Sequence, residues 1–220
     1  MSGLLLDINL VNPSLHERCF TYPGDFGPGR ANVPVMTFHH ISGWRDYLLT
    51  LQIDDPRVPK IHVDAYHAAL RALLLAWVEP AVIKPAELQA LRSLEGALRG
   101  VYFQPMYERK LARNPKLTRE DFGNKLGLGQ LLDHMTDHDG LPVTLHSKSK
   151  RDRGSALDTI RNALAHGDPF NNLPWGGLFE SVREVIVHAY RNHPEPATYP
   201  PQVYDMLGEG LPCNLEPEGP

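Results

Sequence analysis

The sequence predicts a mainly α-helical protein, a bundle of about four to five helices preceded by an irregular or small β N-terminal arm. Apolar side chains recur every three or four residues in the stretches 63–79, 88–101 and 178–190, which places each set on one face of a helix. Pro80 and Pro85 bracket a short link between the first two stretches. Two antiparallel helices joined in this way are the usual start of a bundle.

The chain divides by pattern into three parts: an N-terminal arm or small β appendage at 1–60, the bundle at 61–193 and an acidic, proline-rich tail at 194–220. In the first part, 4–11 and 33–38 have strand-like composition. A turn-rich segment at 22–30 separates them, and 44–52 fits a short helix. In the bundle, a third helix is expected up to Met135, weakened by glycines at 123, 127 and 129.

Composition is typical of a cytoplasmic globular protein. Hydrophobic residues make up 42% of the 220 residues, and the mean hydropathy is −0.32. No apolar run approaches the roughly 20 residues of a membrane span, so no membrane partner is expected. The N-terminus has no basic segment of the kind that opens a secretory signal. Cys19 and Cys213 are therefore expected to be free thiols in a reducing compartment.

The net charge of −4 hides an uneven distribution. The tail carries five acids and no lysine or arginine, so without it the remaining chain has a charge of +1. Four cations lie together just before a short helical stretch and are candidate RNA contacts: Lys148, Lys150, Arg151 and Arg153. A second basic stretch comprises Arg109, Lys110, Arg113, Lys116 and Arg119. Either stretch alone is also typical of a solvated surface.

The stretch 155–170 has the start and stop signals of one short helix. Ser155 and Asp158 have the spacing of a capping box, in which each side chain bonds a backbone amide of the first turn. Gly167 occupies the position that commonly closes a helix, and Pro169 prevents its continuation.

This helix carries Arg161, Asn162 and His166 within a turn and a half. Asn162 and His166 are four residues apart and share one face, and Arg161 flanks the same edge. An imidazole exchanges protons near neutral pH, and a guanidinium binds phosphate in a bidentate way. We therefore interpret His166 as an acid or base, Arg161 as a phosphate clamp and Asn162 as the orienting amide of a phosphodiester-cleaving site.

The run Arg161-Asn-Ala-Leu-Ala-His166-Gly resembles the signature of the HEPN family, an arginine, a polar residue and then a histidine four to six positions after the arginine. The resemblance covers about 61–192 as an architecture and 155–170 as a motif. It implies a helical homodimer that cleaves RNA without metal or other cofactor, by attack of the 2′-hydroxyl on the adjacent phosphate. It also implies toxin–antitoxin or phage-defence roles, with an antitoxin or regulatory protein as a possible partner.

Two alternatives stay open at this point. A non-catalytic bundle of the same kind would bind nucleotides, RNA or a protein. A metal-dependent hydrolase would use His134 and His138, which are spaced to grip one ion from one helix face, with Asp137 or Asp139 adding an oxygen. The second position of this run is Met135 rather than the glutamate of the H-E-x-x-H motif, so no metal site is predicted.

Overall fold

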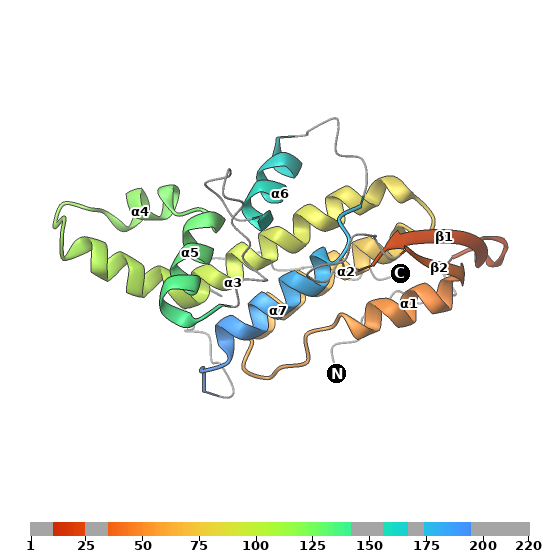
Figure 1. Ribbon diagram of the computed structural model, residues 1–220, viewed down its shortest axis with the longest axis horizontal. Coiled ribbons are helices and arrows are strands. Elements are labelled where there is room, and N and C mark those ends of the chain that lie inside the picture. The colour runs from red at the N-terminus through yellow and green to blue at the C-terminus, as the bar shows by residue number, and fades with distance from the viewer. Residues whose placement is uncertain (1–10, 25–34, 142–155, 167–173, 195–220) are drawn as a thin grey trace, which may run out of the picture.

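The computed structural model describes residues 11–24, 35–141, 156–166 and 174–194. Over these ranges the protein is mostly helical, as predicted, with helices α1–α7, two short 3₁₀ helices at Pro13–Leu15 and Pro80–Val82, and a two-stranded sheet (Figure 1). Three predicted segments lie mostly outside the described residues. Only Val11 of the predicted strand at 4–11, residues 22–24 of the turn-rich segment at 22–30 and Pro194 of the tail are described.

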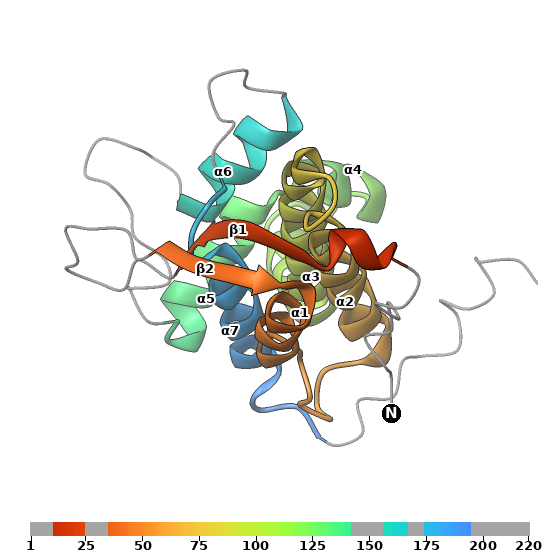
Figure 2. The same ribbon diagram turned by 90° about the vertical axis from the view of Figure 1, so that its right-hand side faces the viewer.

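Two antiparallel strands, β1 (Glu17–Pro23) and β2 (Val35–His40), pack on helix α1 (Ile41–Thr50) at one end of the molecule (Figure 2). Phe20 and Tyr22 alternate with exposed residues along β1, and their rings lie 5.0 and 5.1 Å from the ring of Trp44 in α1. Strand β1 was not predicted from the sequence. The predicted strand at 33–38 begins two residues before β2, and the predicted helix at 44–52 begins three residues after the start of α1.

Helix α3 (Ile83–Leu111) is the centre of the bundle. It packs against α2 (Lys60–Leu75), α7 (Leu178–Tyr190), α5 (Leu128–Asp139) and α6 (Ala156–Ala165). Its buried apolar side chains recur at helical spacing and include Ala90, Leu91, Leu94, Ala97 and Leu98. One core cluster joins these residues to the aromatic side chains of β1 and α1, so the N-terminal elements pack on the bundle.

The second predicted helix is longer than its apolar pattern indicates, because α3 continues to Leu111 instead of ending near Val101. Pro105 lies within it and has no backbone N–H, so the carbonyl of Val101 loses its usual helical donor. Beyond this point the helix packs on α4 (Arg119–Lys125), and Met106 and Tyr107 still contact the core cluster, which includes Phe122 of α4. The Tyr107 hydroxyl also donates to the carbonyl oxygen of Leu117 at 3.2 Å.

The prediction of one helix before Gly140 was wrong, because α4 and α5 are separate. Leu126 adopts extended backbone angles, φ −84° and ψ 103°, and ends α4. Thr118 caps the start of α4 by accepting from the Asp121 amide at 3.0 Å. Gly140 ends α5 with φ 65°, a left-handed conformation that glycine adopts without strain.

Burial of His62 makes the stability of the fold depend on pH. This side chain of α2 is 8% exposed, and burial lowers its pKa from 6.5 to about 4. The unfolded chain therefore binds this proton at a higher pH than the folded protein does. The contribution of His62 to stability is fully present above pH 6.5 and is lost as the pH falls towards 4.

Between pH 7 and pH 5, His62 should lower the free energy of unfolding of the wild type by about 2 kcal/mol, since one pKa unit corresponds to about 1.4 kcal/mol. We expect His62→Leu to lack this decrease. Urea denaturation of wild type and variant at both pH values measures this difference. His39→Leu changes an exposed histidine of β2 and serves as the control. An unchanged pH dependence in His62→Leu would contradict this assignment.

Candidate functional site

Helix α6 confirms that the motif stretch is helical over Ala156–Ala165. Leu157 is buried, and Ile160 and Leu164 pack against the core, so one face of the helix docks on α3 and α5. This apolar spacing, i, i+3 and i+7, is that of an amphipathic helix. Arg161 and Asn162 lie at the edge of the docked face and are half-buried.

Two hydrogen bonds hold the Arg161 guanidinium. Its Nη1 donates to Oδ1 of Asn162 at 3.0 Å, and its Nη2 donates to Oε2 of Glu95 at 3.2 Å. Asn162 and Glu95 thus fix the direction of the guanidinium. Within the described residues, the two bonds use two of the five N–H donors that an arginine carries.

Glu95 of α3 is a site residue that the sequence analysis missed. Its carboxylate pairs with Arg161 through one oxygen and with Arg99 through the other, at 3.1 Å from Nη2 of Arg99. Arg99 in turn donates to the carbonyl oxygens of Gly123 and Leu126, where α4 ends. The four-residue spacing of Glu95 and Arg99 on one helix face was the only signal available in the sequence.

A second tether joins α6 to the start of α5. Oδ1 of Asp158 accepts from the Gly129 amide at 3.2 Å, in the first turn of α5, where Gly127 supplies no side-chain cap. A carboxylate at this end of a helix is favoured by the helix dipole. Asp158 therefore binds α5 here, and Ser155, its predicted partner in the capping box, lies outside the described residues.

His166 directly follows the last residue of α6 and is exposed. Its amide donates to the carbonyl oxygen of Asn162 at 3.0 Å, which continues the helical hydrogen bonding by one residue. The three motif residues thus lie in the last turn and a half of the helical hydrogen bonding of α6. The predicted RNA contacts Lys148, Lys150, Arg151 and Arg153 lie outside the described residues, as do Gly167 and Pro169.

The His134 and His138 pair of α5 has a different environment from the one a metal site needs. The two rings meet edge to face with centroids 4.5 Å apart. Nη1 of Arg109 donates to Nε2 of His138 at 2.7 Å, so an arginine occupies one of the two ring nitrogens that could bind an ion. Among the residues that the structure describes, no group of three or more histidine, cysteine, aspartate or glutamate side chains could hold a metal ion.

Asp139, the other proposed ligand, joins α5 to α7. Its carboxylate accepts from both Nη atoms of Arg191, at 2.6 and 3.0 Å, and from the hydroxyl of Tyr102. Burial opposes its charge, but the hydrogen bonds from Arg191 and Tyr102 outweigh this effect and lower the pKa of Asp139. A bidentate arginine pair of this kind fixes geometry.

An open pocket of about 480 Å³ lies beside these residues, between α3, α5 and the end of α7. Its polar lining comes from Tyr102, His134, His138, Asp139, Asn192 and His193. Burial and the neighbouring His138 and Arg109 lower the pKa of His134, so this imidazole is kept neutral.

Comparison with protein-family models, with curated proteins and with solved structures finds no match to this chain. In the described ranges, none of the helices has the length and apolar character needed to cross a membrane. The functional assignment therefore rests on the chemistry of the residues.

The tether between α6 and α5 leads to a stability prediction for Gly129. A Cβ at this position would lie 2.9 Å from Oδ2 of Asp158, whereas a Cβ at Gly96 in α3 meets no atom within 4 Å. Alanine stabilises a helix relative to glycine by up to about 1 kcal/mol. We expect Gly96→Ala to show this gain, and Gly129→Ala to be about 1–2 kcal/mol less stable than Gly96→Ala because the Asp158 contact is disturbed.

Urea denaturation of the two variants measures the difference between them, and hydrogen exchange reports whether the α6 amides open more readily in Gly129→Ala. Equal stability of the two variants would show that Asp158 does not hold α6 to the start of α5.

Proposed function

We propose that the protein is a metal-independent endoribonuclease of the HEPN kind. The observation that supports this best is the Arg161 guanidinium, oriented by Asn162 at the edge of a docked helix that ends in the exposed His166. A fixed cation and an accessible imidazole within a turn and a half of one helix supply the groups that cleavage by a neighbouring hydroxyl requires.

In the proposed reaction, His166 removes the proton from the RNA 2′-hydroxyl, whose oxygen then attacks the adjacent phosphorus. Arg161 stabilises the negative charge that builds on the phosphorane oxygens. The bond from phosphorus to the 5′-oxygen breaks, and an acid donates a proton to this leaving group. The products are a 2′,3′-cyclic phosphate and a free 5′-hydroxyl, and the reaction consumes no metal or other cofactor.

A homodimer supplies both proton-transfer groups. Each chain carries one such histidine, so two copies with their motifs facing each other offer one base and one acid. Such a nuclease acts on RNA in the cytoplasm, in a toxin or phage-defence system, where an antitoxin or other regulatory protein restrains it.

The alternative of a non-catalytic binding module is favoured by one observation, the ion pair between Arg161 and Glu95. A carboxylate that neutralises the guanidinium reduces its attraction for a phosphate. In this case Arg161 anchors α6 on α3, and RNA, a nucleotide or a protein binds without being cleaved.

Cleavage of a mixed-sequence RNA in excess EDTA tests the proposed activity. We expect wild type to cleave and to leave cyclic phosphate ends, and His166→Ala and Arg161→Ala each to slow the reaction at least about 100-fold, the usual contribution of a general acid or base. His39→Ala, an exposed histidine of β2, should match wild type.

Other outcomes separate the alternatives. RNA that stays intact with EDTA and with added divalent metal, but still binds the protein, would favour the binding module. Cleavage that requires metal and is lost in His134→Ala and His138→Ala would favour the metal-dependent hydrolase.

A further inference from the structure

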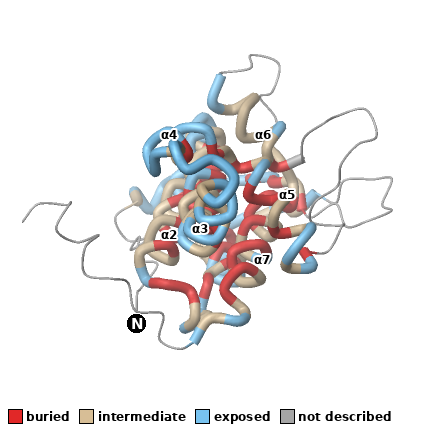
Figure 3. The backbone as a smooth tube through the Cα atoms, turned by 90° about the vertical axis from the view of Figure 1, so that its left-hand side faces the viewer, coloured by how far each residue is buried: buried red, intermediate tan, exposed pale blue. Residues whose placement is uncertain are grey.

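The outer half of α3 and helix α4 form a hairpin, residues 104–125, that projects from the bundle (Figure 1). Figure 3 shows most of its backbone as exposed. Its interior is a small aromatic cluster: the Phe122 ring of α4 lies 5.3 Å from Phe103 and 5.7 Å from Tyr107 of α3. Phe122 is buried and belongs to the core cluster of the bundle, so α4 packs against α3 at the edge of this core.

The hairpin carries more positive than negative charge. Six cations face three carboxylates between residues 104 and 125, and all nine residues are exposed. The cations are Arg109, Lys110, Arg113, Lys116, Arg119 and Lys125. This excess of three positive charges contrasts with a whole chain whose net charge is −4.

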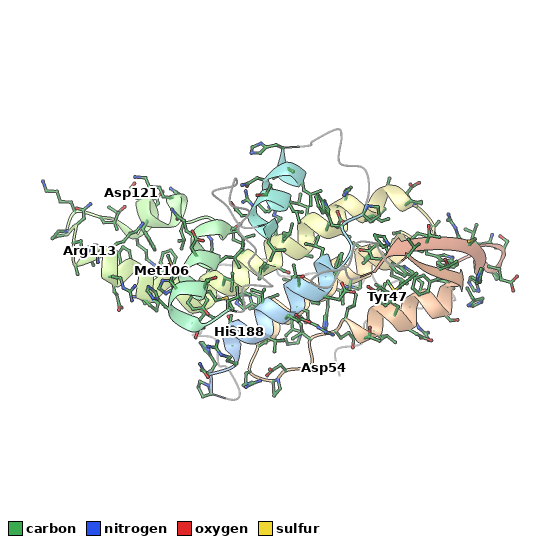
Figure 4. The ribbon with its side chains drawn as sticks, viewed as in Figure 1. Tyr47, Asp54, Met106, Arg113, Asp121 and His188 are labelled. Atoms are coloured by element: carbon green, nitrogen blue, oxygen red, sulfur yellow. The ribbon has the colours of Figure 1, made fainter. Side chains whose placement is uncertain are left out.

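Ring contacts fix two of the cations on the hairpin. Nζ of Lys110 lies 5.3 Å from the Phe122 ring centre, and the Arg119 guanidinium lies 5.1 Å from that of Phe103. Two of the three carboxylates have local partners. Asp121 accepts from the Thr118 hydroxyl at 2.7 Å, and Glu108 accepts from the Gln104 amide at 2.6 Å. Arg113 lies at the outer end of the hairpin (Figure 4).

This basic hairpin and the motif helix occupy the same side of α3. Arg99 contacts the end of α4 and also pairs with Glu95, which in turn pairs with Arg161. Figures 1 and 2 both show α4 and α6 on the upper side of the bundle. From Glu95 to Lys110 the helix rises about 22 Å, at about 1.5 Å per residue.

We propose that the basic hairpin binds the phosphate backbone of a single-stranded RNA whose cleaved bond lies at Arg161 and His166. The inference rests on the proposed ribonuclease function and adds a substrate requirement to it. With phosphates about 3.4 Å apart along a stacked strand, the distance of about 22 Å corresponds to roughly six or seven nucleotides. A single strand fits because the 2′-hydroxyl must rotate into line with the leaving oxygen, which a base-paired strand resists.

Binding of a fluorescein-labelled, 20-nucleotide mixed-sequence RNA tests the hairpin directly. The full-length protein with His166→Ala is used, so that the probe stays intact. The test variant adds Arg113→Gln and Lys116→Gln, and the matched control adds Arg45→Gln and Lys60→Gln, which remove two cations of α1 and α2. We expect the test variant to bind about 5- to 20-fold more weakly at 0.1 M salt and the control to bind as the parent does.

The salt dependence identifies the contacts as phosphate contacts. Removing two of them should make the plot of log affinity against log salt concentration less steep by about 1.4, or about 0.7 for each phosphate on a single strand. Equal weakening in test and control variants, or no binding by the parent protein, would overturn the proposal.

Cleavage assays with His166 present separate this proposal from the function on which it rests. The same two hairpin substitutions should slow cleavage of the 20-nucleotide RNA about 5- to 20-fold at low substrate concentration and leave cleavage of a dinucleotide unchanged. Cleavage of both RNAs at the wild-type rate would overturn the hairpin proposal while leaving the ribonuclease intact. If the wild type cleaves neither RNA, the ribonuclease proposal fails, and the binding measurement alone decides the role of the hairpin.

Discussion

The ion-paired carboxylate of Glu95 links helices α4 and α6 to one point on α3. One oxygen binds Arg99, which satisfies the carbonyl groups at the end of α4, and the other binds Arg161 of α6. The Glu95 side chain is only 14% exposed. Its loss would leave the partly buried guanidinium groups of Arg99 and Arg161 without their shared partner. Two helices that are far apart in the sequence are therefore positioned from one point on α3.

Sequence periodicity predicted the parts of the fold that are set by local rules. The apolar spacing of α2, α3 and α7 and the boundaries of α6 follow from which side chains must face a core. The split between α4 and α5 was missed because the apolar pattern continues through Leu126, where the backbone turns extended. Strand β1 was missed because the only sign of it in the sequence is the alternation of Phe20 and Tyr22. The reason for this alternation, burial of both rings against Trp44 of α1, is visible only in the fold.

The candidate site was predicted as far as one helix can define it. Arg161, Asn162 and His166 come from one short helical stretch, and the bond between Arg161 and Asn162 involves adjacent residues. Glu95 lies 66 positions from Arg161, so only the packing of α6 on α3 brings them together. The same reason hid the role of Asp139, whose partner Arg191 comes from α7.

The position of Pro105 in α3 has a consequence for how such a protein can change over time. Beyond this proline the helix packs on α4, and buried Phe122 of α4 joins this contact to the core cluster of the bundle. The charged residues of the projecting segment are all exposed, so changes among them leave the packing of the bundle intact. Related proteins could diversify this outer segment, and with it their choice of partner, while the residues on α6 and their support on α3 stay constant.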